Sequence, residues 1–463
     1  MKSRNVLVCL LCMMAWSTPR FLRADDKPAA SPPQDFKQLY EEQKRRNDNL
    51  ERRLRVLEEH SKQDLDVVKK EVPEETLKKK DLPEGKEVAE ETLKKKDLPE
   101  ETLQFLQDTK ISGFVSASYF YNFNRPADGM NTGRGFDINH NEFMANKFDL
   151  VLEKPVDYDA SAWQAGYKAE LIFGQDAAFT QAGGLSLGDQ GDLFLGYLEV
   201  NVPIGKGLKV YFGKFQTVIG YEYSETELNA NWSGGNQWTI LEPFTHTGLL
   251  LSYKWSELFE TQILVNNGWD IVKDNNRSKS FMGIINFTPN DDNFASLTAF
   301  GGPEQAGNNA NWRKGVDLVV TRKFTPKFST AVQIDYGQED GAKVVGSTVD
   351  ADGNLVPVIS GGAQWWGAGL WLTYDFSETL STTLRSDYVN DINGARTSQA
   401  PVSAPFPINT GQELYSLTLT VNVKPFKGLR IAPEIRWDHS TLGTAFGGHE
   451  DQVTVGLGAA YFF

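Results

Sequence analysis

The chain has 463 residues, 40% of them hydrophobic, and a formal net charge of -14. This negative balance argues against a nucleic-acid partner, because phosphates call for a clustered basic surface. No window after the first twenty residues offers the roughly 18 consecutive apolar residues that a membrane-spanning helix needs. Yet 11 Trp, 15 Tyr and 28 Phe exceed what a soluble enzyme of this size would need.

Residues 1–24 have the features of an export signal. Two basic residues, Lys2 and Arg4, precede an apolar run over 6–16, and Ala24 ends a plausible cleavage site. Both cysteines of the chain, Cys9 and Cys12, fall inside this segment, so the mature protein would contain no thiol. That excludes disulfide scaffolds, thiolate metal sites and cysteine nucleophiles. Lipid attachment at Cys12 is a weaker alternative, because Leu11 stands where a small residue is expected.

A short linker, 25–35, leads to a predicted coiled coil over 36–68. Its seam positions recur at alternating spacings of four and three, with charged residues on either side. The alternative is a single solvated helix. The seam positions are Phe36, Tyr40, Gln43, Asn47, Leu50, Leu54, Leu57 and Ser61.

Residues 69–110 form a charged spacer that contains the repeat EETLKKKDLPE, at 74–84 and again at 90–100. Pro83 and Pro99 prevent one continuous helix, so we expect short helical turns. The lysine triplets could contact an anionic cell-wall polymer, although a solvated linker explains them as well. Residues 1–110 hold 23 basic and 23 acidic residues, which leaves 24 and 38 for residues 111–463. The whole net charge therefore belongs to the C-terminal part.

From Ile111 the apolar residues recur with a period of two, the spacing of β-strands with two different faces. The last segment, 453–463, alternates apolar residues with mostly small ones. We count about sixteen such segments, within a range of 14–18. They begin near Ile111, Met144, Ala162, Leu193, Leu208, Thr245, Leu258, Ser280, Asn293, Gly315, Lys327, Ala363, Leu380, Gln412, Leu429 and Gln452.

The connections between these segments alternate in length. After even-numbered segments the links are short, as at 203–207 and 424–428, whereas after odd-numbered ones they run from about twelve to twenty-seven residues. An outer-membrane barrel has short periplasmic turns, long external loops and an even number of strands. A closed barrel also satisfies every backbone donor and acceptor within lipid. The sequence thus predicts an all-β, antiparallel up-and-down transmembrane barrel over 111–463, following a periplasmic helical segment.

If the apolar face contacts lipid, the polar face lines a lumen. Charged residues on that face cannot meet hydrocarbon, where an Arg or Lys at the midplane costs about 2–4 kcal/mol. At about sixteen strands a barrel leaves an aqueous channel. Bracing of the wall by ion pairs is the alternative role for these charges, and the two roles are compatible. The pore-lining candidates are Lys147, Asp149, Glu170, Glu199, Asp335, Arg385, Asp387, Arg430, Glu434, Arg436 and Asp438.

The third long loop, 218–244, is the longest connection by this count. A loop of this length should cover the mouth or fold into the lumen, since long loops are usually functional. Folded inward, it would narrow the pore and add negative charge, which would favour cations; a mobile external loop is the alternative. The constriction candidates are Glu222, Glu225, Glu227, Trp232 and Trp238.

Three motifs resemble one family: GKFQTVIGYEY at 213–223, EPFTHTG at 242–248 and VNNGWD at 265–270. Together they look like the pattern of the OmpL-like β-barrel porins, over roughly 111–463. Tyr461 and Phe463 also match the terminal aromatic signature that the barrel assembly machinery recognises. The resemblance implies a homotrimeric porin in outer-membrane lipid that passes small hydrophilic solutes or ions by passive diffusion. It brings no catalytic residues, and we expect neither a cofactor nor a metal.

Two other functions compete with a porin. The barrel could be a structural anchor that tethers the membrane to the cell wall through residues 25–110, since residues 36–68 would span about 50 Å as a helix. An outer-membrane hydrolase would need a Ser nucleophile with a positioned His. None of the five histidines lies in such a motif, so we expect no enzyme. They are His60, His140, His246, His439 and His449.

Overall fold

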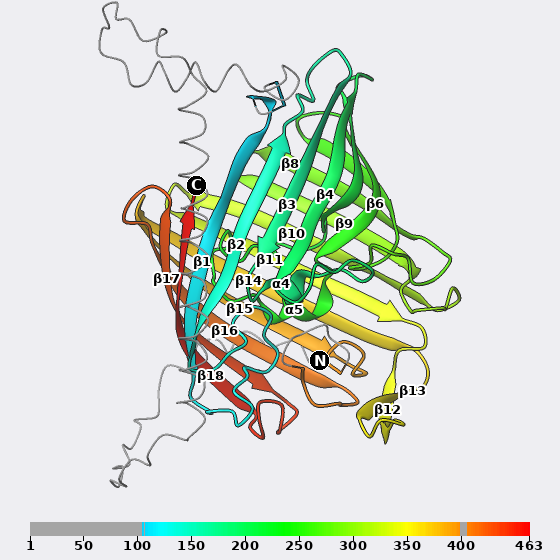
Figure 1. The fold of residues 1–463 in the computed structure, drawn as a ribbon, viewed down its shortest axis with the longest axis vertical. Coiled ribbons are helices and arrows are strands. Elements are labelled where there is room, and N and C mark those ends of the chain that lie inside the picture. The colour runs from blue at the N-terminus through cyan, green and yellow to red at the C-terminus, as the bar shows by residue number, and fades with distance from the viewer. Residues whose placement is uncertain (1–103, 106, 399–404) are drawn as a thin grey trace, which may run out of the picture. The chain divides into compact units, whose positions relative to one another are not determined.

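The computed structural model describes residues 104–105, 107–398 and 405–463 of the chain. The predicted signal, linker and coiled coil, and all of the spacer before residue 104, lie outside these residues. Within them, sixteen strands close into one antiparallel barrel, as predicted (Figure 1). Two short helices, α4 (Ala177–Thr180) and α5 (Asn236–Leu241), lie in loops. No helix of the described residues is long and apolar enough to cross a membrane.

The barrel strands follow one another around the wall in chain order, apart from the inserted pair β12 and β13. Most begin within three residues of the predicted positions. They are β1 (Lys110–Asn122), β2 (Glu142–Lys154), β3 (Gln164–Phe173), β4 (Gly191–Val202), β5 (Leu208–Gln216), β6 (Thr245–Lys254), β7 (Phe259–Asn266), β8 (Ser280–Asn290), β9 (Asn293–Pro303), β10 (Trp312–Thr325), β11 (Phe328–Glu339), β14 (Ala363–Ser377), β15 (Leu380–Asp391), β16 (Gln412–Val423), β17 (Leu429–Ser440) and β18 (Asp451–Phe462).

The first and last strands close the barrel. β1 pairs antiparallel with β18, from Phe114 opposite Phe462 to Asn122 opposite Thr454. Beyond the strand, Phe463 N donates to Gly113 O at 3.0 Å and Gly113 N donates to Phe463 O at 3.2 Å. Closure leaves no unpaired strand edge, which is the arrangement that lipid requires.

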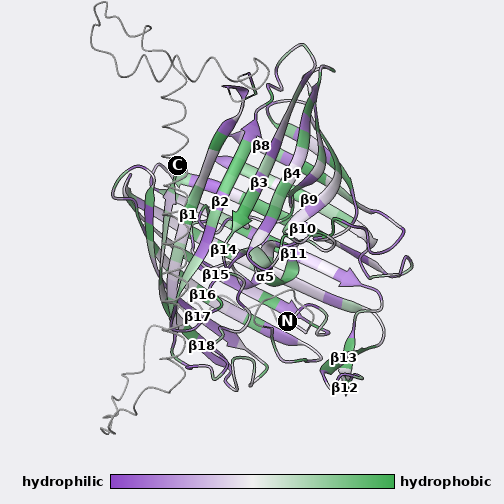
Figure 2. Cartoon of the chain, in the orientation of Figure 1, coloured by the Kyte–Doolittle hydropathy of each residue, from purple (hydrophilic) through white to green (hydrophobic). Residues whose placement is uncertain are grey.

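Side chains alternate between the two faces of the wall. On β16, Tyr415, Leu417 and Leu419 are exposed on the outside, while Thr418 and Thr420 between and beside them are fully buried. In Figure 2, hydrophobic (green) and hydrophilic (purple) bands both occur along the strands of the barrel. The period-two pattern of the sequence therefore corresponds to an apolar outer face and a polar inner face.

The connections gather by length at the two ends of the barrel. Short turns, such as 203–207 and 424–428, lie at the end where β18 finishes, which we name the turn end; the other is the loop end. Two loops, 304–311 and 441–450, are shorter than the sequence-based estimate for this end, in part because β10 and β18 begin before the predicted residues, at Trp312 and Asp451. The loop between β11 and β14 contains an unpredicted hairpin of β12 (Val344–Val349) and β13 (Leu355–Ile359).

Candidate functional site

The connection between β5 and β6, residues 217–244, folds into the barrel, and we name it the inward loop. Its second half, from Asn231 to Phe244, is almost entirely buried and includes α5. Trp232 and Trp238 are among the largest fully buried side chains, with 1% and 2% of their surface exposed. Of the two arrangements that the sequence left open, the loop therefore adopts the inward one.

Acidic and basic residues of β15 and β17 hold the middle of the loop. Arg385 Nη1 donates to Glu222 Oε1 at 2.8 Å and to Ser233 O at 2.6 Å. The Glu434 carboxylate accepts hydrogen bonds from Trp232 N at 2.7 Å and from Ser233 N at 3.2 Å. The backbone N–H and C=O groups of a loop buried in a barrel need hydrogen-bond partners. Arg385 and Glu434 provide such partners for the backbone of Trp232 and Ser233.

Two further arginines of β17 bind carbonyl groups of the loop. Arg430 Nη1 donates to Glu227 O at 2.5 Å, and Arg436 Nη1 donates to Gly234 O at 2.6 Å. Arg436 Nη2 also forms an ion pair of 2.8 Å with Asp438 Oδ1. Charge-assisted bonds of this kind are about twice as strong as neutral ones, so β17 is a strong attachment for the loop.

β1 and β2, which β18 alone separates from β17, hold the loop through Glu227. Its Oε2 lies 3.0 Å from Lys147 Nζ and its Oε1 accepts a hydrogen bond of 2.6 Å from Ser116 Oγ. The neighbouring Glu225 accepts a hydrogen bond of 2.9 Å from Gln216 Nε2. Burial, and then the negative charge of Glu170, raise the pKa of the Glu225 carboxyl to about 8. Glu225 is therefore mostly protonated at neutral pH.

A third attachment lies on β10 and β11. Tyr221 N donates to Gln333 Oε1 at 3.0 Å, and Gln333 Nε2 donates to Glu242 Oε1 at 2.7 Å. These two contacts join the beginning and the end of the inward loop to one wall side chain. The loop is thus bonded to three separate parts of the wall: β1 and β2, β10 and β11, and β15 to β17.

Aromatic residues from three connections pack together on the inward loop. Phe136, Phe179 and Phe244 surround Trp238, with ring centroids 5.8, 6.4 and 4.8 Å from it. Phe136 belongs to the first long loop and Phe179 to α4 in the second. This apolar cluster further narrows the lumen on the side of β1 to β3.

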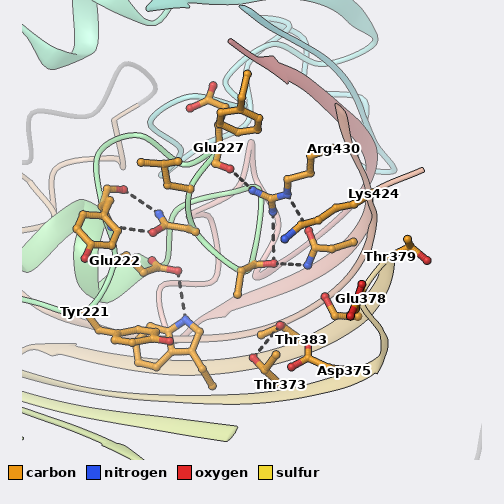
Figure 3. A pocket seen from close by; sticks show the side chains of 18 of the residues that line it. Tyr221, Glu222, Glu227, Thr373, Asp375, Glu378, Thr379, Thr383, Lys424 and Arg430 are labelled. Atoms are coloured by element: carbon orange, nitrogen blue, oxygen red, sulfur yellow. Dashed lines mark hydrogen bonds between the residues drawn. The ribbon is translucent and has the colours of Figure 1, made fainter. Parts of the chain in front are cut away.

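A cavity of about 1020 Å³, which we name the larger cavity, lies between the inward loop and the turn end (Figure 3). Lys424 and Lys427 reach it from the turn between β16 and β17, Asp375 from the end of β14, and Glu378 from the turn between β14 and β15. These four are exposed, whereas Arg430 is buried and bonded to the loop. The cavity therefore offers free charges of both signs.

A smaller cavity of about 240 Å³ lies along β3 to β7, beside the base of the inward loop. Lys168, Lys209, Glu260 and Gln262 line it together with Tyr197 and other aromatic and polar side chains. This is a mixed polar surface without a dominant charge. Among the described residues, no group of three or more His, Cys, Asp or Glu side chains could hold a metal ion.

All eleven pore-lining candidates point into the barrel, but most contact the inward loop or other buried side chains. Each is at most 8% exposed, and only Arg430 among them also lines the larger cavity. Glu222 and Glu227 of the loop candidates line it too. Asp335 and Asp387 accept hydrogen bonds from Gln237 and Asn236 of the inward loop, whereas Asp149, Glu170 and Glu199 are buried in the wall.

Sequence reasoning missed Gln333 and Gln237. A glutamine on an inward-facing position carries no pattern that distinguishes it from any other polar lumenal residue. Only the spatial approach of 220–221 and 242 to one point of β11 reveals the role of Gln333.

Solved structures confirm the fold. The outer membrane channel DcaP of Acinetobacter baumannii is 14% identical, with 77% of this chain and 97% of that chain covered and a TM-score of 0.51. The anion-selective porin from Comamonas acidovorans is 12% identical, with 77% and 99% covered and a TM-score of 0.51. No match was found among curated proteins.

A family model described as "Putative beta-barrel porin-2, OmpL-like" matches residues 108–463, which is the complete barrel. The match starts within three residues of the resemblance seen in the sequence. The chain belongs to this family of OmpL-like β-barrel porins.

Proposed function

We propose that this protein is an outer-membrane channel through which small hydrophilic solutes and ions diffuse passively, with the inward loop as its constriction. One observation carries this proposal: a loop bonded to three parts of the wall narrows the lumen without filling it, because cavities of about 1020 and 240 Å³ remain. The turn end, where β18 finishes, would face the periplasm, and the loop end the exterior.

The permeation path would run past the base of the inward loop along β3 to β7. The smaller cavity lies there, and both it and the larger cavity contact the loop between 217 and 230. The middle of the loop is bonded to β15 and β17, so it obstructs that side. Solutes would therefore pass between the loop and side chains such as Lys209 and Gln262.

A mild preference for cations is the finer part of this proposal. It rests on the surplus of acidic over basic residues in 111–463, 38 against 24. The exposed charges of the larger cavity are balanced, with Asp375 and Glu378 against Lys424 and Lys427. Carboxyl groups that are ion-paired or protonated contribute little to the electrostatic field in the pore. We therefore expect the preference for cations to be modest.

A planar bilayer experiment tests the channel. The purified full-length protein should produce stable ohmic current steps, and a KCl gradient should give a reversal potential of the sign for cations. A variant with residues 223–240 replaced by a short Gly-Ser linker should produce larger steps, because the constriction is removed. Heat-modifiability on gels would verify that both barrels are folded. Folded protein without current above a detergent blank would refute the channel.

Assembly as a homotrimer is a further part of the proposal. Its support is the implication of the family resemblance, and amine crosslinking in native membranes tests it. Bands at three times the monomer mass are expected. Only monomer bands, with another trimeric porin crosslinked in the same membranes, would contradict it.

A further inference from the structure

Gln333 on β11 lies at the centre of three carboxyl groups. Its Nε2 lies 2.7 Å from Glu242 Oε1, 2.9 Å from Asp317 Oδ2 and 3.3 Å from Asp335 Oδ2. A primary amide has only two hydrogens to donate, so the third contact cannot be a full hydrogen bond. We name Asp317, Asp335 and Glu242 the carboxyl trio.

The trio is buried and lacks a cationic partner. Its members are 1%, 5% and 2% exposed, in the order Asp317, Asp335 and Glu242. Among the described residues no ion pair within 4.0 Å involves any of the three, and Glu242 Oε2 has no hydrogen-bond partner. Three buried negative charges this close together cannot all persist without compensation. The trio must therefore retain at least one proton while the loop is in place.

Both ends of the inward loop meet at this point. At its beginning, Gly220 N donates to Asp317 Oδ1 at 3.3 Å and Tyr221 N to Gln333 Oε1 at 3.0 Å. Near its end, Glu242 is a member of the trio, and Gln237 Nε2 of α5 donates to Asp335 Oδ2. Repulsion within the trio would thus act on the loop at both ends at once.

We propose that Gln333 is the positioning residue of the inward loop and that it holds the loop in the lumen only while the carboxyl trio retains a proton. Alkaline conditions would then release the loop from β10 and β11. This inference rests on the proposed channel function, because release of the loop would widen the pore. The observation that supports it is the contact of the Gln333 amide with all three carboxyl groups of the trio.

The charges around the trio determine the direction of the effect. Burial, and then the charge of Asp317, hold the pKa of the Glu242 carboxyl well above its usual range. The charge of Glu222 raises this pKa further, and Glu222 is itself paired with Arg385 of β15 at 2.8 Å. A raised pKa means that the bound loop takes up protons. Its attachment is therefore complete below the ordinary glutamate pKa and weakens as pH rises from there towards the raised value.

Thiol labelling tests this without relying on current. Thr239 of α5 is 1% exposed, and the chain has cysteines only at Cys9 and Cys12, within the predicted export signal. Thr239→Cys should react slowly with a charged thiol reagent at about pH 5 and faster at about pH 9. The reactivity of Tyr223→Cys, at a position 53% exposed, provides the reference for the pH dependence of the thiol itself. The labelling rate of Thr239→Cys divided by that of Tyr223→Cys should rise about tenfold or more between these two pH values, which is the effect expected for one linked proton.

Variants of the trio and of Gln333 distinguish release of the loop by deprotonation of the trio from a general loosening of the barrel at high pH. In a Glu242→Gln background the ratio should stay low at both pH values, since a neutral amide replaces the titrating acid. In a Gln333→Leu background it should be high at both. Gln338→Glu, which places a new carboxylate on the outer face of β11, should behave as wild type. Each variant must first show the heat-modifiability of a folded barrel.

The outcomes distinguish this inference from the channel proposal. A ratio that does not change with pH, or that changes equally in Glu242→Gln, would overturn the inference even if the protein conducts. The expected labelling without any current would preserve the inference and refute the channel. If both proposals hold, wild-type conductance rises with pH and that of Glu242→Gln does not.

Discussion

Arg385 of β15 and Glu222 of the inward loop form an ion pair of 2.8 Å between Nη1 and Oε1, with side-chain exposures of 0% and 2%. The two residues are 163 positions apart in the sequence. Because both side chains are buried, water can compensate little of either charge; Arg385 also lies 3.3 Å from Asp387 Oδ2, whereas Glu222 has no second ion pair among the described residues. The pair therefore couples the position of the loop to the integrity of the wall.

Arg385→Met should destabilise the folded barrel strongly. Removing one partner of a buried ion pair costs about 3–5 kcal/mol, because the other charge remains buried and unpaired. We expect a lower unfolding temperature by gel heat-modifiability and noisier, larger current steps. Glu222→Gln combined with Arg385→Met should recover part of the loss. Lys254→Met, which removes an exposed pair with Glu257, is the matched control; an equal loss in both single variants would contradict the prediction.

Alkaline pH should destabilise the inward loop at Glu225, which interacts with Glu170 of β3. The pKa of Glu225 is raised to about 8, chiefly by burial and then by the charge of Glu170. A raised pKa stabilises the folded state fully below the ordinary value, and that stabilisation is lost as pH rises through about 8. The unfolding temperature of Glu225→Gln should therefore vary less between about pH 6 and pH 9 than that of wild type. Parallel curves for the two proteins would disprove this.

Charge reversal at the turn end should change ion selectivity. Lys424→Glu and Lys427→Glu should shift the reversal potential towards cations, and Asp375→Lys and Glu378→Lys towards anions. A single exposed charge about 10 Å from the path changes the local ion concentration by about a factor of two. Lys314→Glu on the outer side of β10 should have no effect. A shift of the same sign for both pairs of reversals would exclude a role for the larger cavity in conduction.

Phe463→Ala should reduce the amount of protein in the outer membrane. The Phe463 side chain is 51% exposed, and its ring lies 6.2 Å from Phe148, while its backbone bonds to Gly113 do not need the ring. The substitution should therefore affect assembly more than the stability of the finished barrel. Quantitative blots of membrane fractions, and unfolding temperatures of the same protein refolded in detergent, measure the two effects. Normal membrane levels would exclude the terminal aromatic as an assembly signal.

Deleting residues 25–103 should leave single-channel conductance unchanged. The barrel begins at β1, and the first described residues pack on it through Phe105, whose ring stacks on Tyr167 with centroids 6.0 Å apart. If the segment tethers the membrane to the wall, its deletion should abolish co-sedimentation with purified cell-wall polymer. Altered conductance would show that the segment belongs to the channel.

The strands were predictable because every barrel strand must place apolar residues on its outer face and polar residues on its inner face in alternation. Arg430, Glu434, Arg436 and Asp438 alternate with apolar residues on β17, so their shared face follows from local sequence alone. The alternating lengths of the connections then predicted a closed barrel, and the number of segments predicted about sixteen strands; the structure confirms both.

The conformation of the inward loop was not predictable in the same way. It depends on contacts such as Arg385 with Glu222 and Gln333 with Glu242, which join distant segments and leave no periodic signal. The same charged residue can line water or bind a loop carbonyl, and its sequence neighbours are identical in both cases. Arg430 illustrates this, since it borders the larger cavity while donating to the carbonyl of Glu227.

Bonding of the inward loop to three parts of the wall has a mechanical consequence. A wide barrel without internal contacts can flatten, because strand pairing fixes its circumference but not its cross-section. A loop attached to β1 and β2, to β10 and β11, and to β15 to β17 acts as a cross-brace between facing walls. Pressure from neighbouring lipid on one side of the barrel would then be transmitted to the opposite side, so the dimensions of the passage would depend on the surrounding membrane.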